Sequence, residues 1–318
     1  MLMTKPLPLI RHIYQNHTLD STRWDHYSPR PDDIVIATPY KSGTTWMQII
    51  VMHLIFQDLQ LRPFGELSPW LDARWGEPVT NLLQNLEEQN HRRFIKTHLP
   101  LDGLPYFEQV KYIVVGRDAR DVFMSLWHFY RGFGDSFYEK VNRDWPGKSF
   151  PRCPEDISDF WRDWIGKGWF EWESEGYPFW SNLRHVQTWW DFKYLPNILF
   201  VHFNDLLGNL ETEIQRVADF LDIDLPSGLR PKIAEAVTFK NVKQNAEQLG
   251  SRKNFFHKGT NGRWRNMLTE EDLQLYYAAV ARELTSDCAN WLENGRLTSS
   301  HVGRLERKFT KSLEEVNL

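Results

Sequence analysis

Cysteine, long apolar runs and excess positive charge are all scarce in this chain of 318 residues. The two cysteines, Cys153 and Cys288, form neither a disulfide framework nor a metal-ligand spacing, which favours a reducing, cytoplasmic location. The longest apolar stretch, residues 49–56, is interrupted by His53 and is far shorter than the ~20 residues that span a bilayer. The N-terminal residues lack the long apolar core of a signal peptide. The sequence therefore predicts a chain without a membrane span.

The charge balance argues against a nucleic-acid partner. The formal net charge is -4 and the isoelectric point about 6.3, whereas a general nucleic-acid binder is normally basic. With 41% hydrophobic and 25% charged residues, the composition is typical of a folded globular protein. No linker rich in glycine, serine or proline divides the chain. We therefore predict a single domain over residues 1–318, with a charged C-terminal tail at residues 298–318.

Short apolar runs alternate with helical patterns along the chain. The apolar runs predict four strands, at residues 32–39, 92–100, 110–118 and 197–205. The helical patterns predict four helices, at residues 46–57, 121–130, 210–223 and 269–284. Residues 131–195 carry no clear strand, and we expect helices and loops there. This order predicts an α/β fold with a mainly parallel central sheet flanked by helices, and ligands at the carboxyl ends of its strands.

The loop after the first predicted strand is unusually rich in hydrogen-bond donors. The segment "TPYKSGTTWMQ", residues 38–48, joins that strand to a helix. Helix-start amides and the helix dipole favour an anion there. Lys41 adds a full charge, and Gly43 allows close approach of the backbone. Further donors are the hydroxyl groups of Ser42, Thr44 and Thr45. We interpret the segment as a phosphate-binding, P-loop-like turn.

Other interpretations of this loop remain open at this point. A helix start capped by serine or threonine beside a surface lysine would look similar. A small-molecule kinase would need the pattern G-x-x-x-x-G-K-[ST], but here the lysine precedes the glycine and no Mg²⁺ carboxylate is evident. A nucleotide-sensing module without catalysis would use the same loop and need no general base.

A histidine ends the second predicted strand. In "RRFIKTHLP", the two-residue period of a strand puts Lys96 and His98 on one face. An imidazole is largely neutral near pH 7 and can accept a proton, so His98 is a candidate general base. The plain alternative is that one of eleven histidines happens to end a strand.

Four motifs together resemble one enzyme family. "TPYKSGTTW" resembles the 5′-phosphosulfate-binding loop of cytosolic sulfotransferases, which transfer a sulfuryl group from 3′-phosphoadenosine 5′-phosphosulfate (PAPS) to a hydroxyl or amine. "IKTHLP", "VVGRDARDVFMSLWHFY" and "HKGTNGRWRNMLT" resemble three further family segments, in the correct order. The resemblance covers about residues 33–285 and implies a PAPS-dependent sulfotransferase without a metal.

The resemblance implies specific roles. His98 would be the general base, Lys41 would stabilise the leaving group, and Lys96 would support the sulfuryl oxygens. PAPS and its product 3′-phosphoadenosine 5′-phosphate (PAP) would contact Lys41, Ser42, Gly43, Thr44, Thr45, Trp46, Arg117, Ser125, Phe203, Thr238, Phe239, His257, Lys258 and Gly259. In this set, Arg117 and Ser125 would hold the 3′-phosphate, and Trp46 would stack on adenine.

The chain also departs from the family pattern. His257 stands where arginine is usual, and Arg252 or Arg263 could compensate. Arg263 itself replaces an aspartate, and Phe203 stands where many members have tyrosine. The vertebrate dimer motif is not found between residues 240 and 256, so we do not predict that dimer.

The acceptor is expected to be a small lipophilic phenol or alcohol. Seven tryptophans fall between residues 161 and 190, where the family builds its acceptor pocket, although simple core packing would also explain them. The candidate acceptor-binding residues are Phe64, Trp70, Phe129, Phe133 and Phe137.

Overall fold

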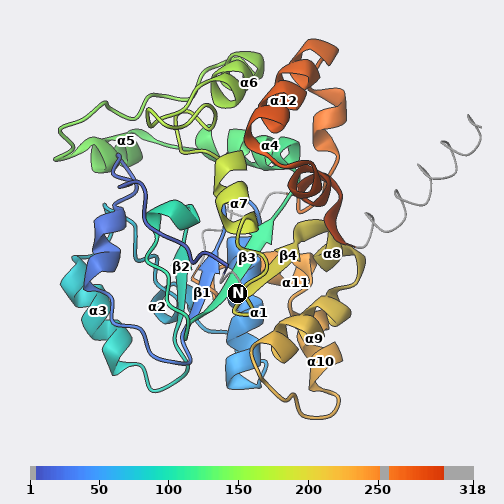
Figure 1. Cartoon of the computed structure of the whole chain (residues 1–318). Coiled ribbons are helices and arrows are strands. Elements are labelled where there is room, and N and C mark those ends of the chain that lie inside the picture. Colours follow the sequence, from blue (N-terminus) through green and yellow to red (C-terminus); the bar gives the residue numbers. More distant parts are fainter. Residues whose placement is uncertain (1–4, 251–257, 297–318) are drawn as a thin grey trace, which may run out of the picture.

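Four short parallel strands form the centre of the molecule, in the order β2-β1-β3-β4 (Figure 1). The structure is a computed structural model, and it describes residues 5–250 and 258–296. The strands are β1 (Ile34–Ala37), β2 (Phe94–Thr97), β3 (Lys111–Gly116) and β4 (Ile198–His202). Parallel neighbours need crossover connections, which the helices supply. The predicted α/β fold with a parallel sheet is confirmed.

Helices flank this sheet. The helices are α1 (Thr44–Phe56), α2 (Phe64–Leu67), α3 (Val79–Glu88), α4 (Ala119–Tyr130), α5 (Asp135–Asn142), α6 (Ile157–Gly166), α7 (Leu183–Trp190), α8 (Phe203–Gly208), α9 (Leu210–Phe220), α10 (Leu229–Ala236), α11 (Phe239–Gln244) and α12 (Glu270–Glu283). Three short 3₁₀ turns are η1 (Ser21–His26), η2 (Leu101–Gly103) and η3 (Arg263–Asn266). None of the helices within the described ranges is long and apolar enough to cross a bilayer.

Successive strand residues enter two different hydrophobic cores, because their side chains point to opposite faces of the sheet. In β1, Ile34 and Ile36 belong to the core that includes side chains of α1, α9, α10 and α11. Val35 and Ala37 belong to the core that includes side chains of α4, α6, α7 and α12. Burial on both faces explains the uninterrupted apolar run "IVIA", and each fully buried aliphatic side chain contributes about 1.5–3 kcal/mol.

The predicted elements are present, but some of their ends differ. The fourth strand, expected over residues 197–205, ends at His202. The His202 side chain accepts a hydrogen bond from the Asn204 amide at 3.1 Å and so caps α8, which begins in the middle of the expected strand. The first helix begins at Thr44, earlier than expected, directly after Gly43 with its positive φ of 112°.

The buried helix faces agree with the sequence pattern, with one exception. The capping box of Thr269 and Asp272 is present at the start of α12. The helical spacing of residues 269–284 places Tyr276 and Tyr277 on one side of α12, and that prediction is wrong for Tyr277, which is 50% exposed while Tyr276 is fully buried. The helical spacing of residues 210–223 places Ile214, Val217, Ala218 and Leu221 on one face of α9, and all four are fully buried.

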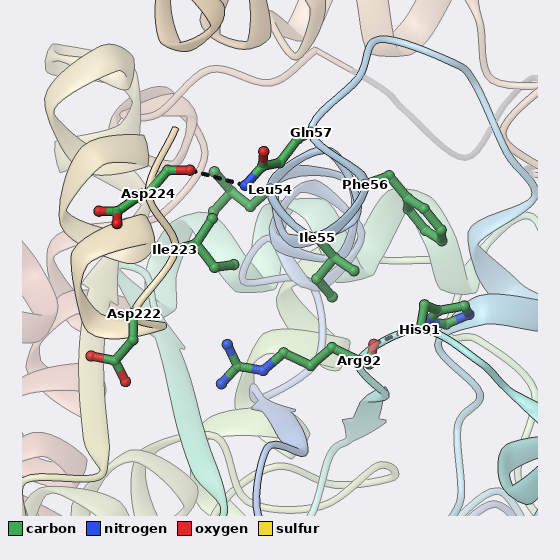
Figure 2. A pocket seen from close by; sticks show the side chains of 9 residues that line it. All are labelled: Leu54, Ile55, Phe56, Gln57, His91, Arg92, Asp222, Ile223 and Asp224. Atoms are coloured by element: carbon green, nitrogen blue, oxygen red, sulfur yellow. Dashed lines mark hydrogen bonds between the residues drawn. The ribbon is translucent and has the colours of Figure 1, made fainter. Parts of the chain in front are cut away.

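A surface pocket of about 370 Å³ lies at the amino edge of the sheet (Figure 2). It is lined by the last turn of α1, by residues 91–92 before β2, and by residues 222–224 after α9. Gln57 Nε2 donates a hydrogen bond to the Asp224 carbonyl oxygen across it, at 2.9 Å. No residue predicted for the active site lines this pocket. The candidate site lies at the opposite, carboxyl edge.

Candidate active site

The segment between β1 and α1 turns sharply to bring its backbone to the carboxyl edge. Lys41 has a positive φ of 60° and Gly43 one of 112°. A Cβ at Gly43 would lie 3.1 Å from the Phe203 ring, so the backbone passes close to the segment after β4. Gly43 is the N-cap of α1 and has no side chain with which to cap the first amides. The helix start therefore suits an anion better than a capping side chain.

His98 follows β2 and is held in one tautomer. Its Nδ1 lies 2.7 Å from the carbonyl oxygen of Thr38, the residue directly after β1. Because a carbonyl only accepts, Nδ1 carries the proton and Nε2 is the basic nitrogen. The Thr38 hydroxyl also contacts Nδ1 at 3.2 Å and the Thr44 hydroxyl at 2.6 Å. His98 is thereby tied to the phosphate-binding segment.

Burial, followed by the charge on Lys96, holds the pKa of His98 well below its usual range. The imidazole is therefore neutral at physiological pH, and the lone pair of Nε2 is unprotonated.

Two lysines lie close to this imidazole, and burial disfavours the charged form of each. Burial, with the charges on Arg117 and Lys96, lowers the pKa of Lys41 to about 7. Burial also lowers the pKa of Lys96 to about 8, against the opposing charge of Asp72. Both ammonium groups lie over aromatic rings: Lys41 Nζ is 4.2 Å from the Phe129 centroid, and Lys96 Nζ is 4.3 Å from the Trp70 centroid. An anionic ligand would favour the charged form of both lysines.

Arg117 follows β3 and lies under the loop after residue 257. Its guanidinium donates to the Asn261 side-chain oxygen at 2.8 and 3.0 Å, and to the Thr260 carbonyl oxygen at 3.1 Å. It also stacks on Phe203, 4.2 Å from the ring centroid. Burial lowers the pKa of Arg117 to about 10, so it stays charged near neutrality.

The same loop is also fixed to α4. Both carboxylate oxygens of Asp121 accept hydrogen bonds, from the amides of Gly262 at 2.9 Å and Arg263 at 3.2 Å. Arg263 in turn contacts the His128 side chain. Ser125 lies on α4 one turn beyond Asp121 and is half buried, and Lys258 is exposed. His257 and Arg252 lie outside the described residues.

The residues expected around adenine also lie near one another. Trp46 Nε1 donates to the Val237 carbonyl oxygen at 2.7 Å, and the Trp46 ring meets Phe203 edge-on at 5.4 Å. Thr238 caps α11, which begins at Phe239. A Cβ at Gly259 would lie 2.4 Å from the Phe239 ring, so only glycine fits there.

The predicted acceptor residues, with one exception, belong to a row of aromatic rings that extends from His98 to Lys41. Trp70 meets His98 edge-on at 4.9 Å. Trp75 joins Trp70 to Phe137, which stacks on Phe133 at 3.8 Å. Phe133 meets Phe129 at 4.8 Å, beneath Lys41. Phe64 lies apart from this row, in α2, because it packs on the core at the other face of the sheet.

Asp72 is a buried residue of the site that the sequence analysis missed. One carboxylate oxygen accepts from Trp70 Nε1 at 2.7 Å and from the His98 amide at 3.2 Å, and the other accepts from Trp24 Nε1 at 3.1 Å. Asp72 therefore holds the His98 backbone and the Trp70 ring in place, and its charge favours the protonated form of Lys96. A lone aspartate in the loop "PWLDARW" gives no local signal of this role.

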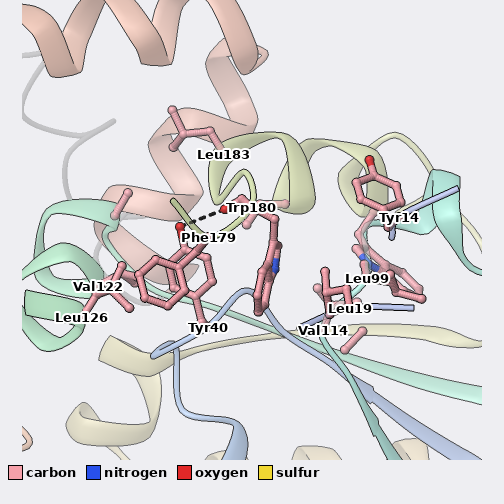
Figure 3. Packing of buried hydrophobic residues seen from close by; sticks show 14 of the residues in the cluster. Tyr14, Leu19, Tyr40, Leu99, Val114, Val122, Leu126, Phe179, Trp180 and Leu183 are labelled. Atoms are coloured by element: carbon pink, nitrogen blue, oxygen red, sulfur yellow. Dashed lines mark hydrogen bonds between the residues drawn. The ribbon is translucent and has the colours of Figure 1, made fainter. Parts of the chain in front are cut away.

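Trp180 was also missed as a site residue. Its ring lies 5.8 Å from His98, and its carbonyl oxygen accepts from Tyr40 Oη at 2.9 Å (Figure 3). Trp180 belongs to the tryptophan-rich segment, in which Trp161, Trp164 and Trp189 are fully buried core residues. The core interpretation holds for these three tryptophans, and a role of Trp180 in acceptor binding stays a prediction.

The carboxyl edge thus brings together a turn suited to an anion, a neutral histidine, two lysines and an arginine. A family model described as "Sulfotransferase domain" matches residues 31–288. The chain belongs to the sulfotransferase family.

Several known sulfotransferases are similar to it. The glycolipid sulfotransferase of Mycobacterium tuberculosis is 30% identical, with 90% of this chain and 95% of that protein covered. Sulfotransferase 1A1 of Rattus norvegicus is 29% identical, with 91% of this chain and 95% of that protein covered. Mouse sulfotransferase SULT7A1, solved in complex with PAP, shares the fold with a TM-score of 0.65 at 24% identity, covering 85% of this chain and 91% of that one.

The predicted enzyme class is therefore confirmed. This sulfotransferase transfers a sulfuryl group from PAPS to a hydroxyl acceptor. The family assignment favours this activity over the kinase and the non-catalytic sensor.

Proposed function

We propose that His98, Lys41 and Lys96 carry out this transfer onto the hydroxyl group of a small lipophilic phenol or alcohol. The tautomer of His98 is the observation that carries the proposal. Because Nδ1–H donates to Thr38, the lone pair of Nε2 can take the proton of the acceptor hydroxyl. The neighbouring lysines can stabilise the negative charge that develops on sulfuryl and leaving-group oxygens.

The residues at the carboxyl edge fit PAPS. PAPS supplies the sulfuryl group, and PAP is the product. The open helix start at Gly43 suits the 5′-phosphosulfate, and Arg117, with Ser125 and Lys258, suits the 3′-phosphate. Gly259 lets its loop pack directly against the Phe239 ring, which any Cβ would overlap. Trp46 offers an aromatic face for adenine, whereas Phe203 cannot supply the hydroxyl that many relatives place there.

The aromatic row from Trp70 to Phe129 supports a lipophilic acceptor. Since a similar mycobacterial protein is named a glycolipid sulfotransferase, lipid-linked hydroxyls belong among the candidates. We place the enzyme in the cytoplasm, as a single domain, without the vertebrate-type dimer.

Incubation with labelled PAPS and a panel of phenols, long-chain alcohols, sterols and glycolipids tests the proposal. We expect transfer to at least one lipophilic class, and none by His98→Ala, whose affinity for PAP should stay within about twofold. A large loss of PAP affinity in His98→Ala would contradict its role as base. PAP binding without transfer to any acceptor would favour the sensor.

A further inference from the structure

The N-terminal segment carries a compact group of exposed aliphatic side chains. Leu7, Leu9, Ile10 and Ile13 are 45%, 73%, 50% and 58% exposed. They account for four of the ten large hydrophobic residues that are exposed in the described ranges, and they fall within seven residues of sequence. We call these four side chains the aliphatic strip. Single exposed aliphatic residues are ordinary, but a group of this density marks an interaction surface.

The backbone of this segment is fixed, so the strip is presented outward by the fold. The Pro6 carbonyl oxygen accepts from Tyr194 Oη at 2.5 Å, and Pro8 is buried. The amides of Arg11 and His12 donate to the Asp102 carbonyl oxygen at 2.7 and 3.1 Å. The His12 ring also stacks on Trp172, with centroids 4.3 Å apart. Figure 1 shows the segment in dark blue, starting near the label N and running toward the left of the view.

The segment has a buried side as well as the exposed aliphatic strip. Tyr14, directly after the strip, is fully buried within the hydrophobic core (Figure 3). Its hydroxyl donates a hydrogen bond to Asp102 at 2.9 Å. Asp102 belongs to η2, shortly after His98 in the chain. The strip is therefore attached to the carboxyl edge of the sheet, where the acceptor hydroxyl reacts.

The N-terminal segment itself carries charge of one sign. Residues 1–19 contain no aspartate or glutamate, while Lys5 and Arg11 are exposed. Asp102, which lies beneath the segment, is buried and paired with Arg184 at 2.5 Å. A surface that is both aliphatic and cationic fits the interface of an anionic lipid bilayer, where apolar side chains enter the acyl boundary and cations meet the headgroups.

We propose that the aliphatic strip docks this protein on anionic membrane surfaces. This inference goes beyond the transfer reaction and does not require any particular acceptor. Docking would bring the carboxyl edge of the sheet close to hydroxyl compounds that are dissolved in the bilayer.

Vesicle flotation tests the proposal with the full chain. Wild-type protein should float with vesicles of phosphatidylcholine and phosphatidylglycerol, less with phosphatidylcholine alone, and less as salt is added. The variant Leu9→Ser/Ile10→Ser/Ile13→Ser should bind about tenfold more weakly or worse. The matched control Leu59→Ser/Leu207→Ser removes two exposed leucines elsewhere, 41% and 44% exposed, and should float like wild type.

Other occupants of the strip are separate outcomes of the test. If wild-type protein does not float, or the strip variant floats equally well, the proposal is overturned. Equal binding to phosphatidylcholine alone would overturn the anionic assignment. If light scattering shows a dimer that the strip variant converts to a monomer, the strip covers a second copy instead. Thermal melting and transfer to a soluble phenol, measured without vesicles, should be unchanged in the strip variant. An inactive wild type that still floats would refute the proposed transfer and leave docking intact.

Discussion

Replacing Lys41 with methionine should make the free protein more stable while removing its activity. The pKa of Lys41 falls from 10.5 to about 7, chiefly through burial. At about 1.4 kcal/mol per unit, that fall corresponds to at most about 5 kcal/mol of destabilisation by the charged form. Part of the side chain still reaches solvent, and methionine loses the contact of the ammonium with Phe129. We therefore expect Lys41→Met to add about 2 kcal/mol to the free energy of unfolding, or roughly 3 °C to the melting temperature.

The pH dependence identifies the cause. The pKa of Lys41 is lower in the folded state than in the unfolded state. The destabilisation by its charge is therefore complete below about pH 7, where both states are protonated, and decreases as the pH rises toward 10.5. Denaturation at about pH 6 and about pH 10 should show the gain shrinking at the higher pH. Lys167→Met, which removes an exposed lysine paired with Asp163, should change stability by less than about 1 kcal/mol. A destabilised Lys41→Met at pH 6, or a gain independent of pH, would refute the reasoning.

Three further outcomes are expected. Above about pH 8, where PAP is fully ionised, the affinity for PAP should fall by up to about a hundredfold per pH unit, because each of the two lysines must regain a proton. Calorimetry in two buffers should detect this proton uptake, and an affinity that stays constant up to pH 9 would contradict it. Asp72→Asn should lower kcat and lower the free energy of unfolding by about 2 kcal/mol, since both carboxylate oxygens accept from N–H donors and an amide NH₂ would oppose one of them. The alkaline side of its pH–rate profile should move to lower pH, because Lys96 loses the negative charge that favours its protonated form. An unchanged alkaline side would count against an effect of Asp72 on Lys96. Gly259→Ala should weaken PAP binding at least about tenfold. The control Gly65→Ala, where a Cβ meets nothing within 4 Å, should leave PAP binding unchanged. Equal PAP affinities of the two variants would contradict the close packing at Gly259.

The local patterns predicted the sheet and the groups that end its strands. The apolar run of β1 and the donors after it are adjacent in sequence, so one window of residues contains both the strand and the anion site. The convergence of Lys41, His98 and Arg117 follows from parallel pairing, because every strand delivers its next residue to the same edge.

Contacts between distant segments could not be predicted in this way. Asp72 accepts hydrogen bonds from Trp24 and His98, on two distant parts of the chain, and its neighbours in sequence reveal neither of them. Phe64 was misplaced among the acceptor residues because aromatic character alone does not say which face of the sheet a loop residue covers. The exposure of Tyr277 had the same origin: helical spacing placed it beside Tyr276, and packing against α6 selected only one of them.

In the site proposed above, the contact between Lys41 and Phe129 links the two substrates. The ammonium group would face the nucleotide, and the ring would face the acceptor. A nucleotide that draws the ammonium toward its own oxygens exposes the ring face, and an acceptor that shifts the ring releases the ammonium. Thermodynamic reciprocity then requires that each substrate changes the affinity of the other by the same factor. Donor and acceptor would therefore bind cooperatively even though no backbone segment has to move between them.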